Sequence, residues 1–241
     1  MKTNIILPIA GHGQRFIDGG YSVPKPLINV DGKYLVEKSL ESVDISDAQL
    51  IFIVRQEHIS DFAIDSRLRE RFGKEIEIIS VDYTTAGAIC TCLLAQDLVN
   101  NETPTIIFTP DCYFEPKFYP DDVPDKYDGM VCVFNSESSA HSYVQLDEDG
   151  FVTKAAEKEV ISKDAVGGLY YFRTGAMFVK YANDLVRANI KSSGEFYICP
   201  VYNFLIADGL KIGIDSNSRH EILGTPEDLE QYLGRKQEAI L

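Results

Sequence analysis

The sequence is short of basic residues and contains no apolar run long enough to cross a membrane. Among its 241 residues, 23 are Lys or Arg and 37 are Asp or Glu, which gives a formal net charge of -14. Nucleic acid and anionic membranes carry negative charge too, so this balance argues against either as the main partner. No apolar run reaches about 18 residues and no basic, apolar leader opens the chain, so we expect a cytoplasmic protein.

Paired cysteines, internal repeats and a nucleophile motif are missing as well. The 5 cysteines lie within apolar stretches without CxxC spacing, which predicts buried free thiols rather than a zinc site or disulfides. No Ser/His/Asp or Cys/His set for nucleophilic catalysis stands out. With 45% hydrophobic residues and no long linker or low-complexity tract, the chain suits one large α/β domain.

The N-terminal stretch combines a strand-length apolar run with a glycine-containing loop and two cations. Residues 5–9 lead into a loop with Gly11 and Gly13; Arg15 follows, and Lys25 stands between two prolines. The glycines let backbone N–H groups approach an anion, while the arginine supplies a fork of donors and the lysine a point charge. The prolines restrict the backbone around the lysine, which lowers the entropy cost of binding a phosphate. These features predict a phosphate-binding site.

A simple tight turn is the alternative for this stretch, because glycines often stand between a strand and a helix. The dinucleotide-binding fingerprint is excluded, since it needs a third glycine where the chain has Phe16. The addition of Arg15 and of the Pro24-Lys25-Pro26-Leu27 element favours the phosphate site over the turn.

Apolar runs of strand length alternate with segments of helical spacing along the chain. We expect strands over residues 50–54, 76–81, 105–110, 129–134, 166–172 and 211–214, helices over 34–43, 60–72, 181–189 and 198–206, and a hairpin over 143–152. This order predicts an α/β fold with a mostly parallel central sheet and helices on both faces. Such sheets bind ligands at the carboxyl ends of their strands.

Two polar positions follow strands and are therefore candidates for ligand contacts. Asp111 ends the apolar strand 105–110, where a carboxylate suits a hard cation, because Mg²⁺ takes one or two carboxylates and leaves its other positions to water and phosphate. Aspartate is also a common turn residue, and that alternative stays open. The turn over residues 82–87 either caps the following helix through Thr84 or Thr85, or lies beneath a nucleobase.

Taken together, the GxGxR pattern of residues 11–15 and the PKPL element of residues 24–27 resemble the signature of the sugar-phosphate nucleotidyltransferases, the nucleoside-diphosphate-sugar pyrophosphorylases. The resemblance runs from Ile5 to Tyr232 and is nearest to compact cytidylyltransferase-like members. It implies a Rossmann-like, GT-A-type nucleotidyltransferase fold in a single domain over residues 1–241. Within it, we expect a nucleotide-binding half over about 1–135 and an acceptor-binding half over 136–241.

The resemblance also implies roles for individual residues. In the nucleotide-binding half, the backbone of Ala10, Gly11 and Gly13 and the side chain of Arg15 would bind the triphosphate, and Lys25 would bridge the reacting phosphates. Asp82 and Gly87 would contact the nucleobase, and Asp111 would bind Mg²⁺. In the acceptor half, Glu157-Lys158 resembles the family's EK element, residues 166–172 its GxYxF strand, and Gly194-Glu195 its GE element. There Lys158 would contact the acceptor phosphate, Gly168 would leave room for the group it carries, and Glu195 would accept a hydrogen bond from that group.

The chain departs from the family in one place. Two residues before the glycine of the GT element, where a second metal-binding aspartate usually stands, this chain has Ile222. The adjacent Glu221 is our candidate for the second metal ligand, and Asp215 is the other candidate nearby.

The implied reaction is attack of a phosphomonoester oxygen on the α-phosphorus of a nucleoside triphosphate, with Mg²⁺ as cofactor and release of pyrophosphate. The acceptor is a sugar 1-phosphate, or a small phosphorylated alcohol or amide such as phosphocholine or phosphoglutamine, and polysaccharide biosynthesis is the expected setting. If Asp82 faces the base, its carboxylate only accepts hydrogen bonds, which favours CTP over UTP or dTTP and does not exclude GTP.

Two other functions stay open. A homo-oligomeric state also stays open. A glycosyltransferase of related fold would use a nucleotide sugar, although Asp111-Cys112-Tyr113 does not resemble the DxD element of such enzymes. A non-catalytic nucleotide-binding paralogue would account for Ile222.

Overall fold

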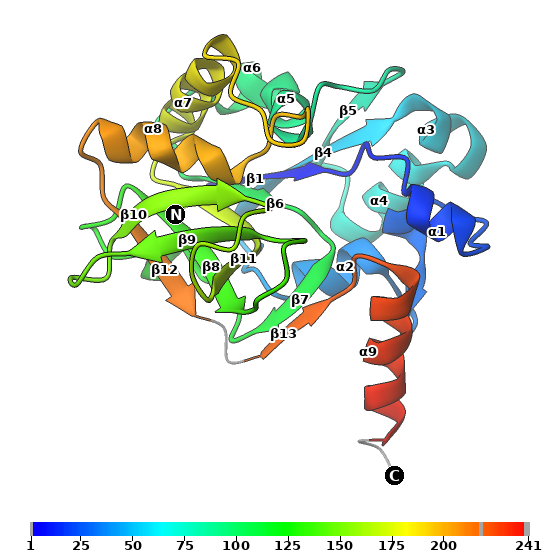
Figure 1. Ribbon diagram of the computed structural model, residues 1–241. Coiled ribbons are helices and arrows are strands. Elements are labelled where there is room, and N and C mark those ends of the chain that lie inside the picture. Colours follow the sequence, from blue (N-terminus) through cyan, green and yellow to red (C-terminus); the bar gives the residue numbers. More distant parts are fainter. Residues whose placement is uncertain (1, 217–218, 239–241) are drawn as a thin grey trace.

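The computed structural model describes residues 2–216 and 219–238, with side chains as far as residue 235. Nine strands of these residues form the central sheet (Figure 1). Seven of them lie side by side in the order β10 (Val152–Glu157), β9 (Ser142–Leu146), β11 (Asp164–Phe172), β6 (Thr105–Phe108), β1 (Thr3–Pro8), β4 (Ala48–Arg55) and β5 (Glu77–Val81). The other two extend from β11, which pairs with β8 (Gly129–Asn135), and β8 pairs with β12 (Ile212–Ser216).

The two halves of the sheet differ in strand direction. β1 runs parallel to both β4 and β6, and β4 runs parallel to β5. β11 is antiparallel to β6, β8 and β9, while β12 is parallel to β8. The expected α/β class with a central sheet is therefore confirmed, and β11 joins its parallel half to the hairpin of β9 and β10.

Helices cover both faces of the sheet, as Figure 1 shows. On one face lie α5 (Ala88–Cys92), α6 (Gln96–Val99), α7 (Gly175–Arg187) and α8 (Tyr202–Ala207), and on the other α2 (Leu35–Leu40), α3 (Gln56–Phe62) and α4 (Ile64–Phe72). Two further helices, α1 (Gln14–Asp18) and α9 (Pro226–Glu238), lie near the glycine loop, and α9 extends away from the sheet.

The central strand β1 shows why the sequence has an uninterrupted apolar run from Ile5 to Leu7. Ile6 packs in the core beneath the helices α5 to α8, whereas Ile5 and Leu7 pack in the second core on the side of α2 and α4. All three side chains are fully buried, as expected of a parallel strand that is covered on both faces. The glycine loop is thus attached to a strand that is buried from Thr3 to Leu7.

Two differences between the observed helices and the sequence-based expectation have a clear local cause or lack a local signal. The helix expected over 60–72 consists of α3 and α4, which are separated by Ala63 in the left-handed conformation at φ 49. No glycine or proline occurs in residues 56–72, so the sequence carries no signal for this break. The helix expected from residue 181 begins earlier, because Thr174 Oγ1 accepts a hydrogen bond from the Met177 N–H at 3.1 Å and caps α7.

Two small sheets were not expected from the sequence. One is the hairpin of β2 (Asn29–Val30) and β3 (Lys33–Tyr34). The other pairs β7 (Cys112–Glu115) with β13 (Arg219–Ile222) antiparallel, with Ile222 opposite Cys112. This second pairing brings the C-terminal part of the chain to the residues that follow β6.

The cysteine prediction is confirmed: all five are free thiols, four of them buried and Cys90 partly buried. No helix within residues 2–216 and 219–238 combines the length and the apolar character that crossing a membrane requires.

Candidate active site

A cavity of about 410 Å³ lies at the carboxyl ends of β1 and β6. Residues from four separate segments line it: the glycine loop, the turn around Lys25, the residues after β6, and Gly224 before α9. The predicted site residues among them are Gly11, Gly13, Arg15, Lys25 and Asp111. Their convergence is the arrangement that the sequence predicted for a phosphate-binding site.

The glycine loop leaves backbone donors free for an anion. Gly13 has φ 66, a left-handed conformation that favours glycine, and a Cβ there would lie 3.4 Å from Lys25 Cβ. Gly11 has open space where a side chain would stand. Within the described part of the chain, no acceptor takes up the N–H groups of Gly11, His12 or Gly13.

Arg15 is exposed at the cavity wall, and its guanidinium has no partner among the described residues. Five donors in a planar fork are therefore available to phosphate oxygens.

Lys25 is held by the turn that carries it. Pro24 precedes the 3₁₀ turn of Lys25–Leu27, and the Leu27 N–H donates to the Pro24 carbonyl at 2.8 Å. The ammonium Nζ lies 3.8 Å from Asp111 Oδ2 and 3.5 Å from the Gly224 carbonyl oxygen. A cation and an anion that the sequence predicted separately thus face each other in one cavity.

Asp111 also lines a second cavity, of about 140 Å³, which shares Thr109 and Asp111 with the first. Its other walls come from β7, β8, β9, β10, β11 and β13 and from the residues just before β9. Gly168 lines it with φ 80, and a Cβ there would lie 2.8 Å from Thr109 Oγ1, so a side chain at this position would collide with the junction of the two cavities.

Three polar residues of the second cavity were not singled out by the sequence, namely His141, Glu157 and His220. Glu157 belongs to the EK element, but no motif surrounds either histidine. The His220 ring stacks between Phe134 and Phe114, with ring centroids 4.0 and 5.9 Å away. Burial lowers the pKa of His220 to about 4, so the imidazole is neutral at pH 7.

Burial also shifts the pKa values of the other two residues, His141 and Glu157. Burial lowers the pKa of His141 and raises the pKa of Glu157, whose carboxylate accepts a hydrogen bond from Ser142 that opposes this rise. No lysine or arginine lines the second cavity within the described residues.

The predicted base-binding residues lie apart from both cavities. Asp82 is exposed, and its carboxylate has no hydrogen bond or ion pair among the residues described. The loop that carries it is joined to the glycine loop, because His12 Nε2 lies 3.1 Å from Thr84 Oγ1. Gly87 has φ 136, and a Cβ on it would overlap the Phe196 backbone, so close packing already requires this glycine. Contacts of Asp82 and Gly87 with a base stay predictions.

Lys158 and Glu195 are exposed beside the second cavity rather than within its walls. The Lys158 N–H donates to the carbonyl of the cavity residue His141 at 3.0 Å. Its ammonium donates to the phenol oxygen of Tyr197 at 2.5 Å.

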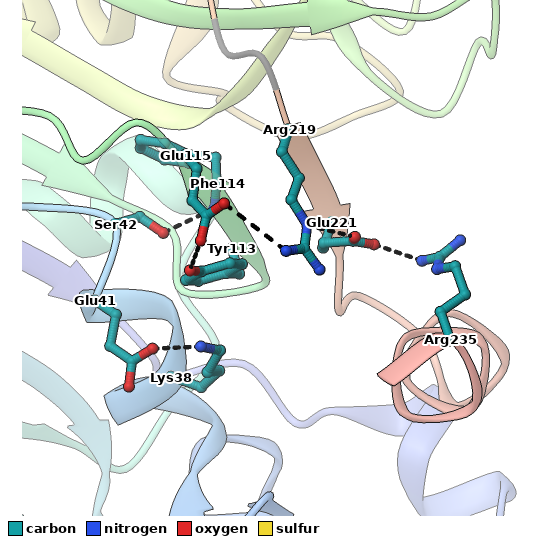
Figure 2. Close-up of polar contacts among 9 residues, drawn as sticks. All are labelled: Lys38, Glu41, Ser42, Tyr113, Phe114, Glu115, Arg219, Glu221 and Arg235. Atoms are coloured by element: carbon teal, nitrogen blue, oxygen red, sulfur yellow. Dashed lines mark hydrogen bonds and ion pairs between the residues drawn. The ribbon is translucent and has the colours of Figure 1, made fainter. Parts of the chain in front are cut away.

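Glu221 does not point at the cavity. Its carboxylate accepts hydrogen bonds from Arg219 and Arg235, as Figure 2 shows, and Glu221 lines neither cavity. Its neighbours His220 and Ile222 line the second cavity, because successive residues of a strand face opposite sides. Glu221 thus faces away from Asp111 in this structure, and its role as the second metal ligand stays a prediction.

Asp215 does not replace it. Its Oδ2 lies 3.9 Å from Cys132 Sγ, and its side chain lines a different cavity, beside Phe118 and Ile214. Within residues 2–216 and 219–238, no three His, Cys, Asp or Glu side chains are grouped to hold a metal ion. Asp111 is thus the one predicted metal ligand that the described structure places in the cavity.

The C-terminal segment completes the site through its backbone. The Leu223 N–H donates to the Asp111 carbonyl at 2.7 Å, and the Gly224 carbonyl accepts from Lys25. Helix α9 follows directly, and Thr225 Oγ1 accepts a hydrogen bond from the Asp228 N–H at 3.2 Å at its start.

Solved structures of nucleotidyltransferases have the same fold. The nucleoside-diphosphate-sugar pyrophosphorylase from Vibrio cholerae RC9 is 26% identical, with a TM-score of 0.84 over 95% of this chain and 99% of that one. The inositol-1-phosphate CTP transferase from T. maritima is 16% identical, with a TM-score of 0.75 over 99% of this chain and 95% of that one. The CTP:phosphocholine cytidylyltransferase from Streptococcus pneumoniae is 16% identical, with a TM-score of 0.74 over 98% of this chain and 99% of that one.

No curated protein sequence matches the chain. The family model described as nucleotidyl transferase matches residues 3–200, a stretch that includes the glycine loop, Lys25, Asp111 and Lys158. By this match, and by the cavity that these residues line or border, the chain belongs to the nucleotidyl transferase family.

Proposed function

We propose that this nucleotidyltransferase joins a nucleoside triphosphate, CTP in preference to UTP or dTTP, to a small phosphomonoester in a Mg²⁺-dependent reaction that releases pyrophosphate. The observation that carries the proposal is the Lys25–Asp111 pair, 3.8 Å apart where the two cavities meet. One cavity has room for a triphosphate beside free donors, and the other has room for the group that an acceptor carries.

Phosphoryl transfer of this kind asks the protein to position the reactants and to neutralise charge. The free N–H groups of the glycine loop and the Arg15 guanidinium would hold the triphosphate in the first cavity. Lys25 would contact the oxygens of the reacting phosphates, because it lines the same cavity as the glycine loop and its ammonium lies 3.8 Å from Asp111 Oδ2. No covalent intermediate on the protein is needed.

The Asp111 carboxylate fits a Mg²⁺ ligand. Its side chain is 48% exposed and lines both cavities, so phosphate oxygens and water have access to the same place. A Mg²⁺ ion bound there would neutralise charge on the triphosphate and the attacking phosphate.

The preference for CTP rests on Asp82. Its carboxylate is exposed, and no group in the described residues uses its lone pairs. A carboxylate accepts from the exocyclic amine of cytosine and repels the carbonyl oxygen that uracil and thymine present at that place. Guanine also offers donors, so GTP is the competitor to test.

The acceptor phosphate would bind Lys158 at the rim, with its remaining group in the second cavity. A sugar 1-phosphate and a phosphorylated alcohol such as phosphocholine are the acceptors to compare. The cytidylyltransferases of the same fold are named for inositol 1-phosphate and phosphocholine, which makes both suitable probes.

Pyrophosphate release tests the proposal. The protein is mixed with Mg²⁺, one of CTP, UTP, dTTP, GTP or ATP, and one acceptor from a panel of glucose 1-phosphate, inositol 1-phosphate, phosphocholine and phosphoglutamine. We expect release that depends on both substrates and is fastest with CTP. Release without an acceptor would indicate hydrolysis, and consumption of a nucleotide sugar in its place would indicate a glycosyltransferase.

Ile222 favours a second candidate, a nucleotide-binding protein without turnover, because this side chain lines the second cavity where the family carries a metal-binding carboxylate. A rise in melting temperature with CTP and Mg²⁺, without pyrophosphate release for any acceptor, would support that candidate over the enzyme.

A further inference from the structure

Residues 194–197, here called the bridging segment, connect the loop of the predicted base site to the acceptor side. The Phe196 N–H donates to the Ala86 carbonyl at 2.9 Å, and the Phe196 carbonyl accepts from the Ile89 N–H at 3.2 Å. The backbone of the bridging segment is therefore bonded on both sides to the start of α5.

Close packing fixes the same contact. Gly87 has φ 136, and a Cβ added to it would lie 2.5 Å from the Phe196 nitrogen, nearer than real Cβ contacts occur. The Phe196 side chain is also buried in the core beneath α7 and α8. Tyr197, the next residue, thus starts from a backbone that has little freedom to move.

Tyr197 contacts Lys158 across the gap to β10. Its phenol oxygen accepts from Lys158 Nζ at 2.5 Å, and Nζ lies 4.7 Å from the ring centroid. An ammonium has three N–H donors, so this contact leaves two for another acceptor. The hydrogen bond to Tyr197 is the main cause that raises the pKa of Lys158.

The backbone of Lys158 is fixed at its other end. Its φ is 57, a left-handed conformation that non-glycine residues adopt only where the surroundings impose it. The Lys158 N–H donates to the His141 carbonyl at 3.0 Å, and both His141 and the preceding Glu157 line the second cavity. The backbone of Lys158 therefore lies at the wall of the second cavity, and its ammonium lies on Tyr197.

We infer that Tyr197 is a positioning residue that holds the Lys158 ammonium at the rim of the second cavity, ready to bind the phosphate of the acceptor. The inference rests on the proposed function, in which Lys158 binds that phosphate. A long, flexible lysine loses rotamer freedom when it binds, and a side chain that is already held loses less. The bridging segment supplies the fixed point, since Phe196 anchors the residue that carries the phenol.

Tyr197→Phe tests the inference because it keeps the ring and removes only the oxygen. We expect KM for the phosphorylated acceptor to rise roughly tenfold, the scale of a hydrogen bond to a charged group, with KM for the nucleotide changed by less than about twofold. In a protein that already carries Lys158→Met, adding Tyr197→Phe should not raise KM for the phosphorylated acceptor any further. Tyr119→Phe is the matched control, because Tyr119 is exposed beside a cavity that shares no residue with the site.

A second measurement does not depend on turnover. In protein labelled with ¹³C-lysine, the Cε signal of Lys158, assigned by its loss in Lys158→Met, reports both its pKa and its response to inorganic phosphate. We expect Tyr197→Phe to lower this pKa and to raise the phosphate concentration needed to shift the signal.

The outcomes separate the two proposals. An unchanged Lys158 pKa with an unchanged phosphate titration in Tyr197→Phe overturns the positioning role, as does a loss shared equally by both substrates. If the wild-type protein releases no pyrophosphate with any substrate pair, the proposed function fails, and the phosphate titration decides on Tyr197 by itself.

Discussion

The ammonium of Lys25 lies 3.8 Å from the carboxylate of Asp111, between the two cavities of the site. Neither side chain is buried, with 22% and 48% of their surfaces exposed, so the pair contributes little to stability. The position of this ion pair between the cavities, rather than its contribution to stability, indicates a role in the reaction. The reacting phosphates and a cation would meet where these opposite charges lie.

Lys25→Ala should lower turnover by a factor of at least ~10², the usual scale for loss of one preorganised donor to developing charge. The fold should stay intact, because the turn is held by backbone contacts of Pro24 and Leu27. Pyrophosphate-release kinetics measure the effect, with the highly exposed Lys163→Ala as control. Turnover near the wild-type value in Lys25→Ala would remove this lysine from the mechanism.

Asp111→Asn should shift the Mg²⁺ dependence of activity to higher concentration. The amide keeps the shape of the side chain but lacks the negative charge that a hard cation prefers. A Mg²⁺ titration of pyrophosphate release measures the midpoint, and Asp122→Asn serves as a control away from the site. If the midpoint and the maximal rate both stay unchanged, Asp111 is only a turn residue.

Ile222→Asp should lower the Mg²⁺ midpoint, because it places a second carboxylate in the cavity that Asp111 lines. Ile222→Asn matches the shape without the charge and should not have this effect. Glu221→Gln should also leave the midpoint unchanged, since that carboxylate pairs with Arg219 and Arg235. A raised midpoint in Glu221→Gln would reinstate this residue as a ligand.

Asp82→Gln should reduce the preference for CTP over UTP. A mismatch that leaves a charged acceptor unpaired costs at least ~1–3 kcal/mol, or roughly ten- to a hundredfold in selectivity. The measurement is the ratio of kcat/KM for the two nucleotides in wild type and variant. Equal ratios would show that Asp82 only shapes its turn.

Stability should fall as the pH drops from about 6.5 toward 4, in part because of His220. Burial depresses its folded pKa to about 4, an effect that Asp111 opposes and His141 reinforces. Below about pH 6.5 the unfolded chain binds the proton more readily than the folded one, so this contribution, up to about 3 kcal/mol, is lost as the pH falls. The free energy of unfolding in urea at pH 7 and pH 5 should differ less in His220→Asn than in wild type. His12→Gln, at an exposed histidine, should keep the wild-type difference.

The convergence of the glycine loop, Arg15 and Lys25 on one cavity was predictable because these residues are close together in the sequence. A glycine loop, an arginine and a lysine between prolines lie within residues 11–26, directly after a buried strand. Asp111 was predictable for a related reason, since the carboxyl ends of parallel strands such as β1 and β6 meet at one edge of the sheet.

The second cavity was harder to predict from the sequence, because its walls come together through pairings between distant segments. His220 lines the cavity because β13 pairs with β7, and no local sequence pattern predicts this pairing. Within β13, a shift of one residue decides which side chain faces the cavity, and this is why the sequence alone does not tell whether Glu221 or its neighbours line it. The Tyr197–Lys158 contact likewise joins two segments whose separation in the sequence hides it.

The contacts of Leu223 and Gly224 have a consequence for biosynthesis. A growing chain that has reached residue 200 already contains the glycine loop, Lys25 and Asp111, yet it lacks the backbone groups that bond to the last two of these. β7 at that stage also has no partner strand, because β13 is not yet made. The segment that bonds to Asp111 and Lys25 is therefore synthesised after both of them, and the cavity takes the arrangement described here only once this segment has folded back onto β7.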